Sequence, residues 1–403
     1  MLNVTEEPSE IRFGTDGWRG LIARDFTFAN VRRCAQGVSD LLYSEGLASR
    51  GLVVGYDTRF GSEDFANEVV RVVTAQGIKT YLCDRSTPTP GVSYGVLQLG
   101  AGAGVVITAS HNAASWNGFK YKPEYAGSAS PEIVAKLEAF IAGTGIEQDI
   151  TTLPLETAKS KGLVTSFNPT EGYLEKLGGL VDLDAIRNSG LRIVVDSMHG
   201  AGATFLATLL EGGRTTVTEL RGEANPRFPG MTQPEPIYPN LSTAARTIRE
   251  HGYNVGFATD GDADRLGVLD ERGEYMTSLQ VFSLLCLHLL EVKGLKGPIV
   301  KSLTQSNMID RLGEIYGVSI VTTEVGFKYL GPTMMRENAI AAGEESGGYA
   351  FRGHIPERDG LLSALLFLEL MVKTKTPASK LGEWLQKLVG PHHFDRLDIT
   401  IDP

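Results

Sequence analysis

The clearest group of potential metal ligands is an acidic triplet at alternate positions. Asp260, Asp262 and Asp264 stand in the segment DGDADR, with Arg265 directly after them. Three such carboxylates would repel one another, and a hard divalent cation bound by oxygen ligands removes that repulsion. The arginine adds a fixed positive charge beside the metal, which suits phosphoryl transfer. An acidic surface turn is the main alternative, and an EF-hand is disfavoured because Arg265 stands where that loop needs glycine.

A second group surrounds a serine that follows an apolar run. Ser110 lies in TASHN beside His111, and Lys120 follows in NGFK. A serine hydroxyl becomes a useful nucleophile only when a base or positive groups assist it. Ser110 lies outside any G-x-S-x-G segment, which argues against a hydrolase triad. Lys120 could act as a general acid or base or neutralise a phosphate, and a simple Ser/Asn-rich turn is the alternative.

Two glycine-rich segments are weaker candidates. In GTDGWRG, glycines recur every three residues, which lets backbone N–H groups approach an anion, and Arg12 and Arg19 add guanidinium donors. In GEESGG, Glu344 and Ser346 could hydrogen-bond vicinal hydroxyls, as on a sugar. The alternatives are a structural turn and a flexible loop at a helix start. Further on, Asp359 could cap the apolar helix that follows it.

These motifs follow short apolar runs that alternate with helical patterns. Strands are predicted at 52–57, 104–108, 191–196, 254–259 and 297–302, and helices at 63–76, 131–141, 203–210, 241–251 and 360–372. This alternation predicts an α/β fold with mixed, mostly parallel sheets. Ligands of such sheets bind outside the carboxyl ends of strands, and four of these ends read GYDTR, ITASHN, VVDSMHG and FATDGDADR.

The length of 403 residues suits several consecutive α/β domains around a central cleft. We expect a first domain at 1–155, a second at 156–272 and a third at 273–390, with 391–403 as the start of a fourth. The polar segment 144–161 is interpreted as a linker.

Composition excludes several classes of partner. The net charge of −10 disfavours nucleic acid and acidic membranes. The N-terminal segment is acidic where a signal peptide would be basic. The longest apolar stretches, 279–290 and 361–372, are too short to span a bilayer and are interpreted as core helices. Cys34, Cys83 and Cys286 lack metal-ligand spacing and are expected to be buried thiols. We therefore expect a cytoplasmic protein.

Taken together, the motifs resemble those of the α-D-phosphohexomutase family, specifically its phosphoglucomutase and phosphomannomutase members. FGTDGWRG is similar to the family's N-terminal signature, TASHN to its phosphoserine loop, DGDADR to its metal loop and GEESGG to its sugar-recognition loop. The four segments occur in the family's order. NGFK, NPRFPG, TEVGFK and RDG agree as well.

The resemblance implies a reversible reaction between hexose 1-phosphate and hexose 6-phosphate, through phosphorylated Ser110 and a hexose 1,6-bisphosphate. It implies one Mg²⁺ per chain, bound by the three aspartates and Ser110, with Arg19, Lys120 and Arg265 stabilising the transferring group. Lys120, with His111 nearby, would be the general acid or base. Glucose 1,6-bisphosphate would be the activator. The residues implied in substrate binding are Arg12, Thr15, Glu344, Ser346, Lys328 and Arg358.

The resemblance favours glucose over mannose as the sugar. It implies small hexose phosphates as the partners and a monomer or weak homodimer as the oligomeric state. The sequence departs from the family at Ala113, where proline is common, and at Gly348, where some relatives carry histidine. Glucosamine-type relatives tend towards SASHN and GEQSGH, which it does not follow. The family's R-x-S-G-T-E-P phosphate loop does not occur in the 403 residues, so we expect the fourth domain to be absent or only a stub.

Two other functions remain open from the sequence. A non-catalytic phosphosugar-binding protein, or an inactive fragment, would share the same motifs. A phosphatase with an aspartate nucleophile at Asp260 or Asp262 would leave TASHN and GEESGG unexplained.

Overall fold

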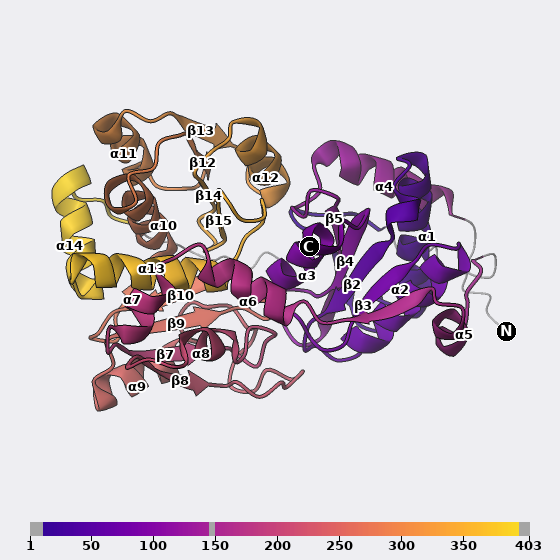
Figure 1. Ribbon diagram of the computed structural model, residues 1–403, viewed down its shortest axis with the longest axis horizontal. Coiled ribbons are helices and arrows are strands. Elements are labelled where there is room, and N and C mark those ends of the chain that lie inside the picture. The colour runs from indigo at the N-terminus through magenta and orange to yellow at the C-terminus, as the bar shows by residue number, and fades with distance from the viewer. Residues whose placement is uncertain (1–10, 145–149, 395–403) are drawn as a thin grey trace.

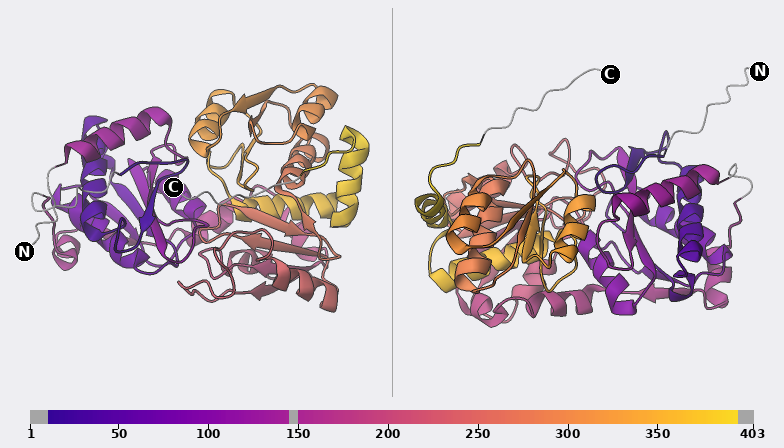
Figure 2. Two further views of the ribbon diagram at one scale, coloured as in Figure 1. Left: turned by 180° about the vertical axis from the view of Figure 1, so that it is seen from behind. Right: turned by 90° about the horizontal axis from the view of Figure 1, so that it is seen from above.

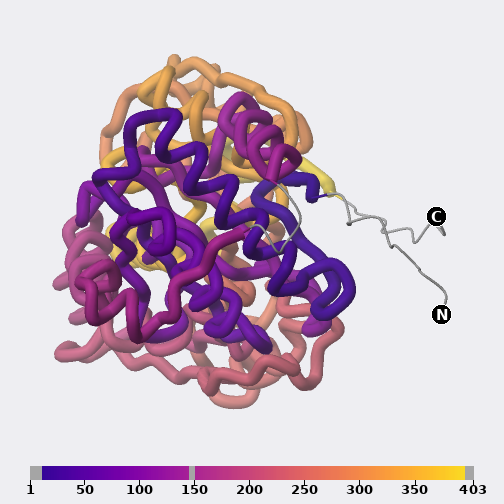
Figure 3. The backbone as a smooth tube through the Cα atoms, turned by 90° about the vertical axis from the view of Figure 1, so that its right-hand side faces the viewer, coloured from indigo at the N-terminus to yellow at the C-terminus, as the bar shows by residue number. Residues whose placement is uncertain are grey.

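The computed structural model describes residues 11–144 and 150–394. Within them the chain forms three consecutive α/β units, which appear in Figure 1 as the indigo-to-purple, salmon and orange parts. The first unit stands beside the other two, and Figure 3 shows the second and third units one above the other behind it. The predicted fold class, α/β units with mixed and mostly parallel sheets, is confirmed.

The first unit contains a six-stranded sheet in the order β1-β5-β4-β2-β3-β6, in which β4, β2, β3 and β6 are parallel. Its strands are β1 (Trp18–Leu21), β2 (Leu52–Tyr56), β3 (Thr80–Cys83), β4 (Ala103–Ile107), β5 (Trp116–Pro123) and β6 (Val164–Phe167). Its helices are α1 (Phe28–Ser44), α2 (Ser62–Ala75), α3 (Thr89–Leu99), α4 (Pro131–Gly143) and α5 (Leu155–Ser160), with a 3₁₀ turn at Ala48–Arg50.

Both faces of β2 and β4 are buried. Val54 and Val105 belong to the core that contains α1 and α2, whereas Val53 and Val106 belong to a core that contains α3. Successive side chains of a strand point to opposite faces, so a continuous apolar run is what a strand covered on both sides requires.

The first sheet extends beyond the predicted domain boundary at residue 155. Helix α5 lies inside the segment interpreted as a linker, and β6 pairs with β3 at the edge of the sheet. Because residues 155–160 form a helix, the linker prediction is wrong there. The strand β6 was not predicted, because an edge pairing between distant segments leaves little local signal. Residues 145–149 lie outside the described residues.

The second unit contains a five-stranded sheet in the order β11-β10-β9-β7-β8. Its elements are α6 (Thr170–Gly178), α7 (Leu183–Asn188), β7 (Arg192–Asp196), α8 (Phe205–Leu210), β8 (Thr216–Leu220), α9 (Ser242–His251), β9 (Val255–Thr259), β10 (Leu266–Leu269) and β11 (Tyr275–Met276). The predicted boundary at 272 falls inside the β10–β11 hairpin, because β11 pairs with β10.

The third unit contains a four-stranded sheet in the order β13-β12-β14-β15. Its elements are α10 (Ser278–Leu287), a π-helical turn (His288–Val292), β12 (Ile299–Ser302), α11 (Met308–Tyr316), β13 (Ile320–Thr323), α12 (Phe327–Arg336), β14 (Ala341–Gly343), β15 (Tyr349–Phe351), α13 (Gly360–Thr374) and α14 (Ala378–Val389). Residues 395–403, most of the predicted start of a fourth domain, lie outside the described residues.

Helix α13 joins the second and third units, as Figures 1 and 2 show. Its N-cap is Asp359, whose side chain accepts a hydrogen bond from the Leu362 N–H, so the capping role that the sequence allowed is present. Every α13 residue up to Met371 is buried, and its apolar side chains belong to a core that both units share. The apolar run at 361–372 is therefore a core helix, and no described helix is long and apolar enough to cross a membrane. The three cysteines are buried and free, as predicted.

Candidate active site

Ser110 stands in a turn of unusual backbone conformation at the carboxyl end of β4. It has φ = +53°, a left-handed conformation that is uncommon for residues other than glycine. Ser110 is buried, and its Oγ donates a hydrogen bond to Oδ2 of Asp260 at 2.7 Å. His111 Nδ1 lies 3.5 Å from Oγ of Ser110. The structure thus brings the predicted nucleophile of the first unit to the predicted metal loop of the second.

The acidic triplet forms the turn between β9 and β10. Asp260, Asp262 and Asp264 are fully buried, and one ligand oxygen from each lies within 4.8 Å of the other two. Ala263, within the turn, has φ = +57°. Both alternatives for this segment are wrong, because strands rather than helices flank the turn and because the turn is not at the surface.

The three aspartates fit a hard divalent cation. Oδ1 of Asp262 and Oδ1 of Asp264 are buried without a hydrogen-bond partner. Burial, followed by the charges of Asp264 and Asp262, raises the pKa of Asp260 well above its ordinary value. Buried carboxylates are costly unless a cation or hydrogen bonds compensate them, and oxygen ligands of this kind suit Mg²⁺.

Lys120 reaches the acidic triplet from β5. Its Nζ lies 2.8 Å from Asp262, 2.9 Å from Asp264 and 2.7 Å from Asp16. Burial opposes the charge of Lys120, but the attraction of these three carboxylates outweighs it and raises the pKa of the ammonium group. Lys120 is therefore a firmly charged cation in this arrangement, suited to neutralising negative charge.

Arg358 brings the third unit into the same cluster. Its guanidinium bonds to Asp16, lies 2.9 Å from Asp264 and lies 3.5 Å from Glu344. Burial acts against ionisation of Asp16, yet Lys120, Lys122 and Arg358 hold its pKa well below the ordinary value. Asp16 is consequently the shared anion that joins a cation of the first unit to one of the third.

Two further arginines make the surroundings of His111 positive. Arg19 Nη1 donates to Oδ1 of Asn112 at 2.5 Å, and Arg265 Nη1 lies 3.5 Å from Glu235. Burial, then the charges of Arg265 and Arg19, lowers the pKa of His111 well below its ordinary value. The imidazole is therefore neutral at pH 7.

The predicted sugar loop is the turn between β14 and β15. Glu344 is buried and accepts the Gly326 N–H at 3.0 Å. Burial raises the pKa of Glu344 to about 7, although Arg358 and Arg265 act in the opposite direction. Ser346 is partly exposed in the same turn. A Cβ atom at Gly348 would lie only 2.2 Å from Cδ of Arg358, so Arg358 fills the space that a side chain there would need.

The remaining predicted residues lie around this cluster. Thr15 packs against Gly326, where an added Cβ would lie 3.3 Å from the Thr15 Cβ. Lys328 donates to the Gly14 carbonyl at 3.2 Å. Both contacts join the first unit to the third. Arg12 is exposed and forms an ion pair with Glu138 of α4 at 3.7 Å.

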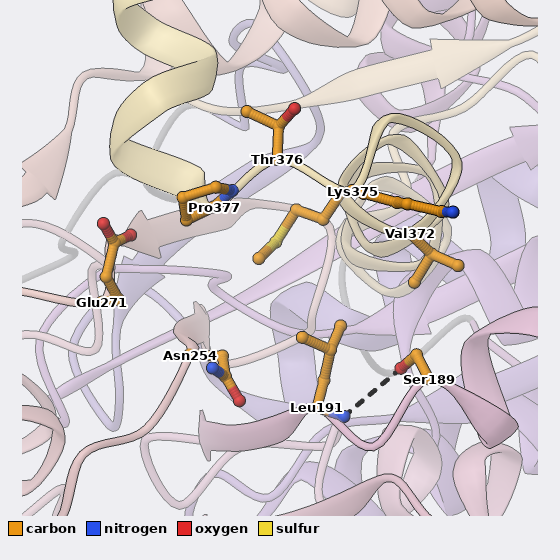
Figure 4. Close-up of a pocket in the computed structure, with 9 residues that line it drawn as sticks. Ser189, Leu191, Asn254, Glu271, Val372, Lys375, Thr376 and Pro377 are labelled. Carbon is orange, nitrogen blue, oxygen red and sulfur yellow. Dashed lines mark hydrogen bonds between the residues drawn. The ribbon is translucent and has the colours of Figure 1, made fainter.

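A cavity of about 470 Å³ lies elsewhere, between the second and third units (Figure 4). Leu191 and Asn254, at the amino ends of β7 and β9, face the end of α13 across it. The sheet edge with the acidic turn is the opposite one, and none of the predicted site residues lines the cavity. It is therefore separate from the serine and metal loops.

Comparison with known families identifies all three units. Residues 10–146, 171–273 and 278–388 match the models of phosphoglucomutase/phosphomannomutase alpha/beta/alpha domains I, II and III, respectively. The chain belongs to the phosphoglucomutase/phosphomannomutase family. Because this family and the relatives described below are mutases, the chain is an enzyme, an intramolecular phosphotransferase acting on hexose phosphates.

The relatives carry different sugar specificities in their names. A phosphoglucosamine mutase of Anoxybacillus flavithermus is 31% identical, over 95% of this chain and 84% of its own. A phosphoglucomutase/phosphomannomutase of Thermococcus kodakarensis is 28% identical, over 93% and 80%. The crystal structure of a proposed phosphomannomutase from Thermus thermophilus has a TM-score of 0.87 at 34% identity, over 95% and 85%.

Several residues of this cluster and its surroundings were not singled out from the sequence. Asp16 lies inside the glycine-rich segment, where the glycines and arginines suggested an anion site and the aspartate was not assigned a role. Thr89, at the start of α3, donates from Oγ1 to Oδ2 of Asp262 at 2.5 Å, and no motif marks it. Asp57 and Arg59 stand in GYDTR, and its place at the polar end of a strand was the one sequence feature that could have pointed to them.

Proposed function

We propose that this mutase interconverts hexose 1-phosphate and hexose 6-phosphate by way of a phosphoryl group carried on Ser110, with glucose preferred and mannose also accepted. The observation that supports this most strongly is the 2.7 Å hydrogen bond from Ser110 Oγ to Asp260 inside a fully buried triplet of aspartates. A phosphate on this oxygen would lie among the cationic side chains that phosphoryl transfer requires.

The residues that would hold Mg²⁺ are Asp260, Asp262 and Asp264, together with an oxygen on Ser110. When bound, the metal would neutralise charge on the transferring phosphoryl group. Lys120, Arg19 and Arg265 supply further positive charge around the same position. Holding the reacting groups in place while neutralising their charge accounts for most of the catalysis in such reactions.

The transfer itself exchanges one P–O bond for another. The bond from phosphorus to Ser110 Oγ breaks and a bond to the free sugar hydroxyl oxygen forms, and the proton of that hydroxyl ends on the serine oxygen. In the second half the bisphosphate returns its other phosphoryl group to Ser110. We propose that Lys120 is the general acid or base that carries this proton, with His111 Nδ1 only 3.5 Å from the serine oxygen.

Glu344 and Ser346 are proposed to bind sugar hydroxyls, with Thr15, Lys328, Arg358 and Arg12 as further substrate-binding residues. Glucose 1,6-bisphosphate is proposed as the activator. The resemblance of GEES to glucose-type loops supports glucose, whereas the named relatives include glucosamine mutases. A cytoplasmic monomer or weak homodimer stays a prediction.

The test is Ser110→Ala, with Ser115→Ala as the matched control in the same loop. Turnover of glucose 1-phosphate with Mg²⁺ and glucose 1,6-bisphosphate should fall at least about 1,000-fold in Ser110→Ala and stay close to wild type in the control. Intact-mass spectrometry should find one phosphate on the wild type and none on Ser110→Ala. Undiminished turnover by Ser110→Ala would refute the proposal. Mannose and glucosamine 1-phosphates, assayed in parallel, establish the sugar preference.

A further inference from the structure

Arg59, directly after β2, makes an unusual number of contacts with the serine loop, which we define as residues 108–116. Its side chain is completely buried. Its two terminal nitrogens donate to four backbone carbonyls of this loop, those of Ser110 (2.6 Å), Asn112 (2.6 Å), Ala113 (2.9 Å) and Trp116 (3.2 Å). One side chain therefore binds the backbone of the proposed nucleophile and of the loop residues that follow it.

Asp57 connects the same arginine to the start of the loop. The Arg59 Nε lies 3.1 Å from Oδ2 of Asp57, and that oxygen also accepts a hydrogen bond of 2.6 Å from the Thr108 hydroxyl. The Thr108 hydroxyl oxygen in turn accepts the Ser110 N–H at 2.8 Å. The Ser110 N–H and the Ser110 carbonyl are thus bound through the same Asp57–Arg59 pair.

This arrangement explains how a serine is held at φ = +53°. A non-glycine residue keeps such a conformation only where its surroundings enforce it. Glycine, which would adopt it freely, lacks the hydroxyl. Four carbonyl acceptors also require the planar five-donor guanidinium, since a lysine offers three donors from a single point.

The second unit closes over the same turn. Thr58 Oγ1 donates to the His199 carbonyl at 2.8 Å, and the Phe228 ring centroid lies 5.0 Å from Cζ of Arg59. Gly261 of the acidic turn approaches so closely that an added Cβ would lie 2.6 Å from the Ser110 carbonyl oxygen. The serine loop and the acidic turn therefore meet where Arg59 holds the serine backbone.

We propose that Arg59 is a positioning residue for phosphoryl transfer: it fixes the backbone of Ser110 so that Oγ points at the acidic turn, without contacting the substrate. The inference rests on the proposed role of Ser110 as the phosphoryl carrier. A misplacement of the reacting oxygen by about 1 Å is enough to cost about 100-fold in rate.

The test compares Arg59→Lys and Arg59→Ala with Arg221→Lys in the full chain with Mg²⁺. Arg221 is a matched control because it also pairs with a buried aspartate, Asp196, and donates to a backbone carbonyl, that of Asn240. We expect kcat to fall about 100-fold in both Arg59 variants, with KM within about 3-fold of wild type. Arg221→Lys should keep the wild-type kcat even where its melting temperature falls.

Added guanidinium distinguishes positioning from general loss of stability. It should raise kcat of Arg59→Ala about 10-fold and leave wild type and Arg221→Lys unchanged, because only that variant has the vacated site. A folded Arg59→Lys with wild-type kcat, or an Arg59→Ala that guanidinium does not restore, would overturn the proposal.

Thr108→Val carries the test if the Arg59 variants do not fold. It removes only the hydroxyl that joins Asp57 to the Ser110 N–H, and kcat should fall about 10-fold at unchanged KM. Wild-type kcat in Thr108→Val would contradict the inference. Activity retained by Ser110→Ala would instead contradict the proposed function, so the two failures are distinguishable.

Discussion

The contact between the second and third units differs in kind from the contacts that bring the first unit to both. One apolar core runs through the second and third units, with Phe367 of α13 packed edge-on against Phe257 of β9. Around the site, by contrast, the first unit reaches the others through charges, as in the 2.6 Å contact between Lys122 and Glu357 and the 2.8 Å contact between Lys120 and Asp262.

This difference indicates how the enzyme can combine rigidity with adjustment. Apolar burial is non-directional and is lost only when surfaces separate, so the second and third units should behave as one body. Ion pairs depend on geometry and can exchange partners. Lys120 and Arg358 both contact Asp16 and Asp264 of the acidic turn. We therefore expect the first unit to be the part whose contacts change as phosphate and metal bind.

The largest expected effect comes from breaking the apolar contact. Phe367→Ala should lower the free energy of unfolding by about 3–5 kcal/mol, because it removes a fully buried ring from the shared core. Urea denaturation measures this, with Phe60→Ala as the control, since Phe60 is 68% exposed. If Phe367→Ala lowers the free energy of unfolding no more than Phe60→Ala does, the second and third units cannot be treated as one body.

A similar or smaller effect is expected at the charged contact. Lys122→Met leaves Glu357 buried without its lysine and should cost about 3 kcal/mol of unfolding free energy. The double variant Lys122→Met/Glu357→Gln should regain part of that loss, because the uncompensated charge is gone. If the single variant costs less than about 1 kcal/mol, as an exposed pair would, this contact is not the buried ion pair described here.

The smallest expected effect is the pH dependence due to Glu344, whose pKa burial raises from 4.5 to about 7. The folded state binds this proton more tightly than the unfolded chain, so the stabilisation is complete below about pH 4.5 and is lost as the pH rises through 7. Relative to Glu344→Gln, the wild type should lose about 2–3 kcal/mol between pH 5 and 8 without metal. Denaturation of both proteins at each pH measures this, and parallel profiles would contradict it.

The fold could be predicted wherever the signal was local. Apolar runs such as 52–57 and 254–259 predicted strands, and the acidic triplet identified its own turn. The edge strand β6 could not be placed, because its pairing with β3 depends on distant residues. Asp16 and Arg59 were missed for the same reason: each acts by contacting groups of other segments, and neither type of residue is unusual in a turn.

Gly348 and Arg358 together occupy a space that admits a single side chain. The Arg358 stem fills what a substituent at 348 would need, so the two positions should covary within the family: a bulky residue at 348 should be accompanied by a shorter one at 358. Members of the family could be sorted by this pair of positions into those that fill this space from position 348 and those that fill it with the stem of an arginine at 358. Sequence identity alone would not reveal that division.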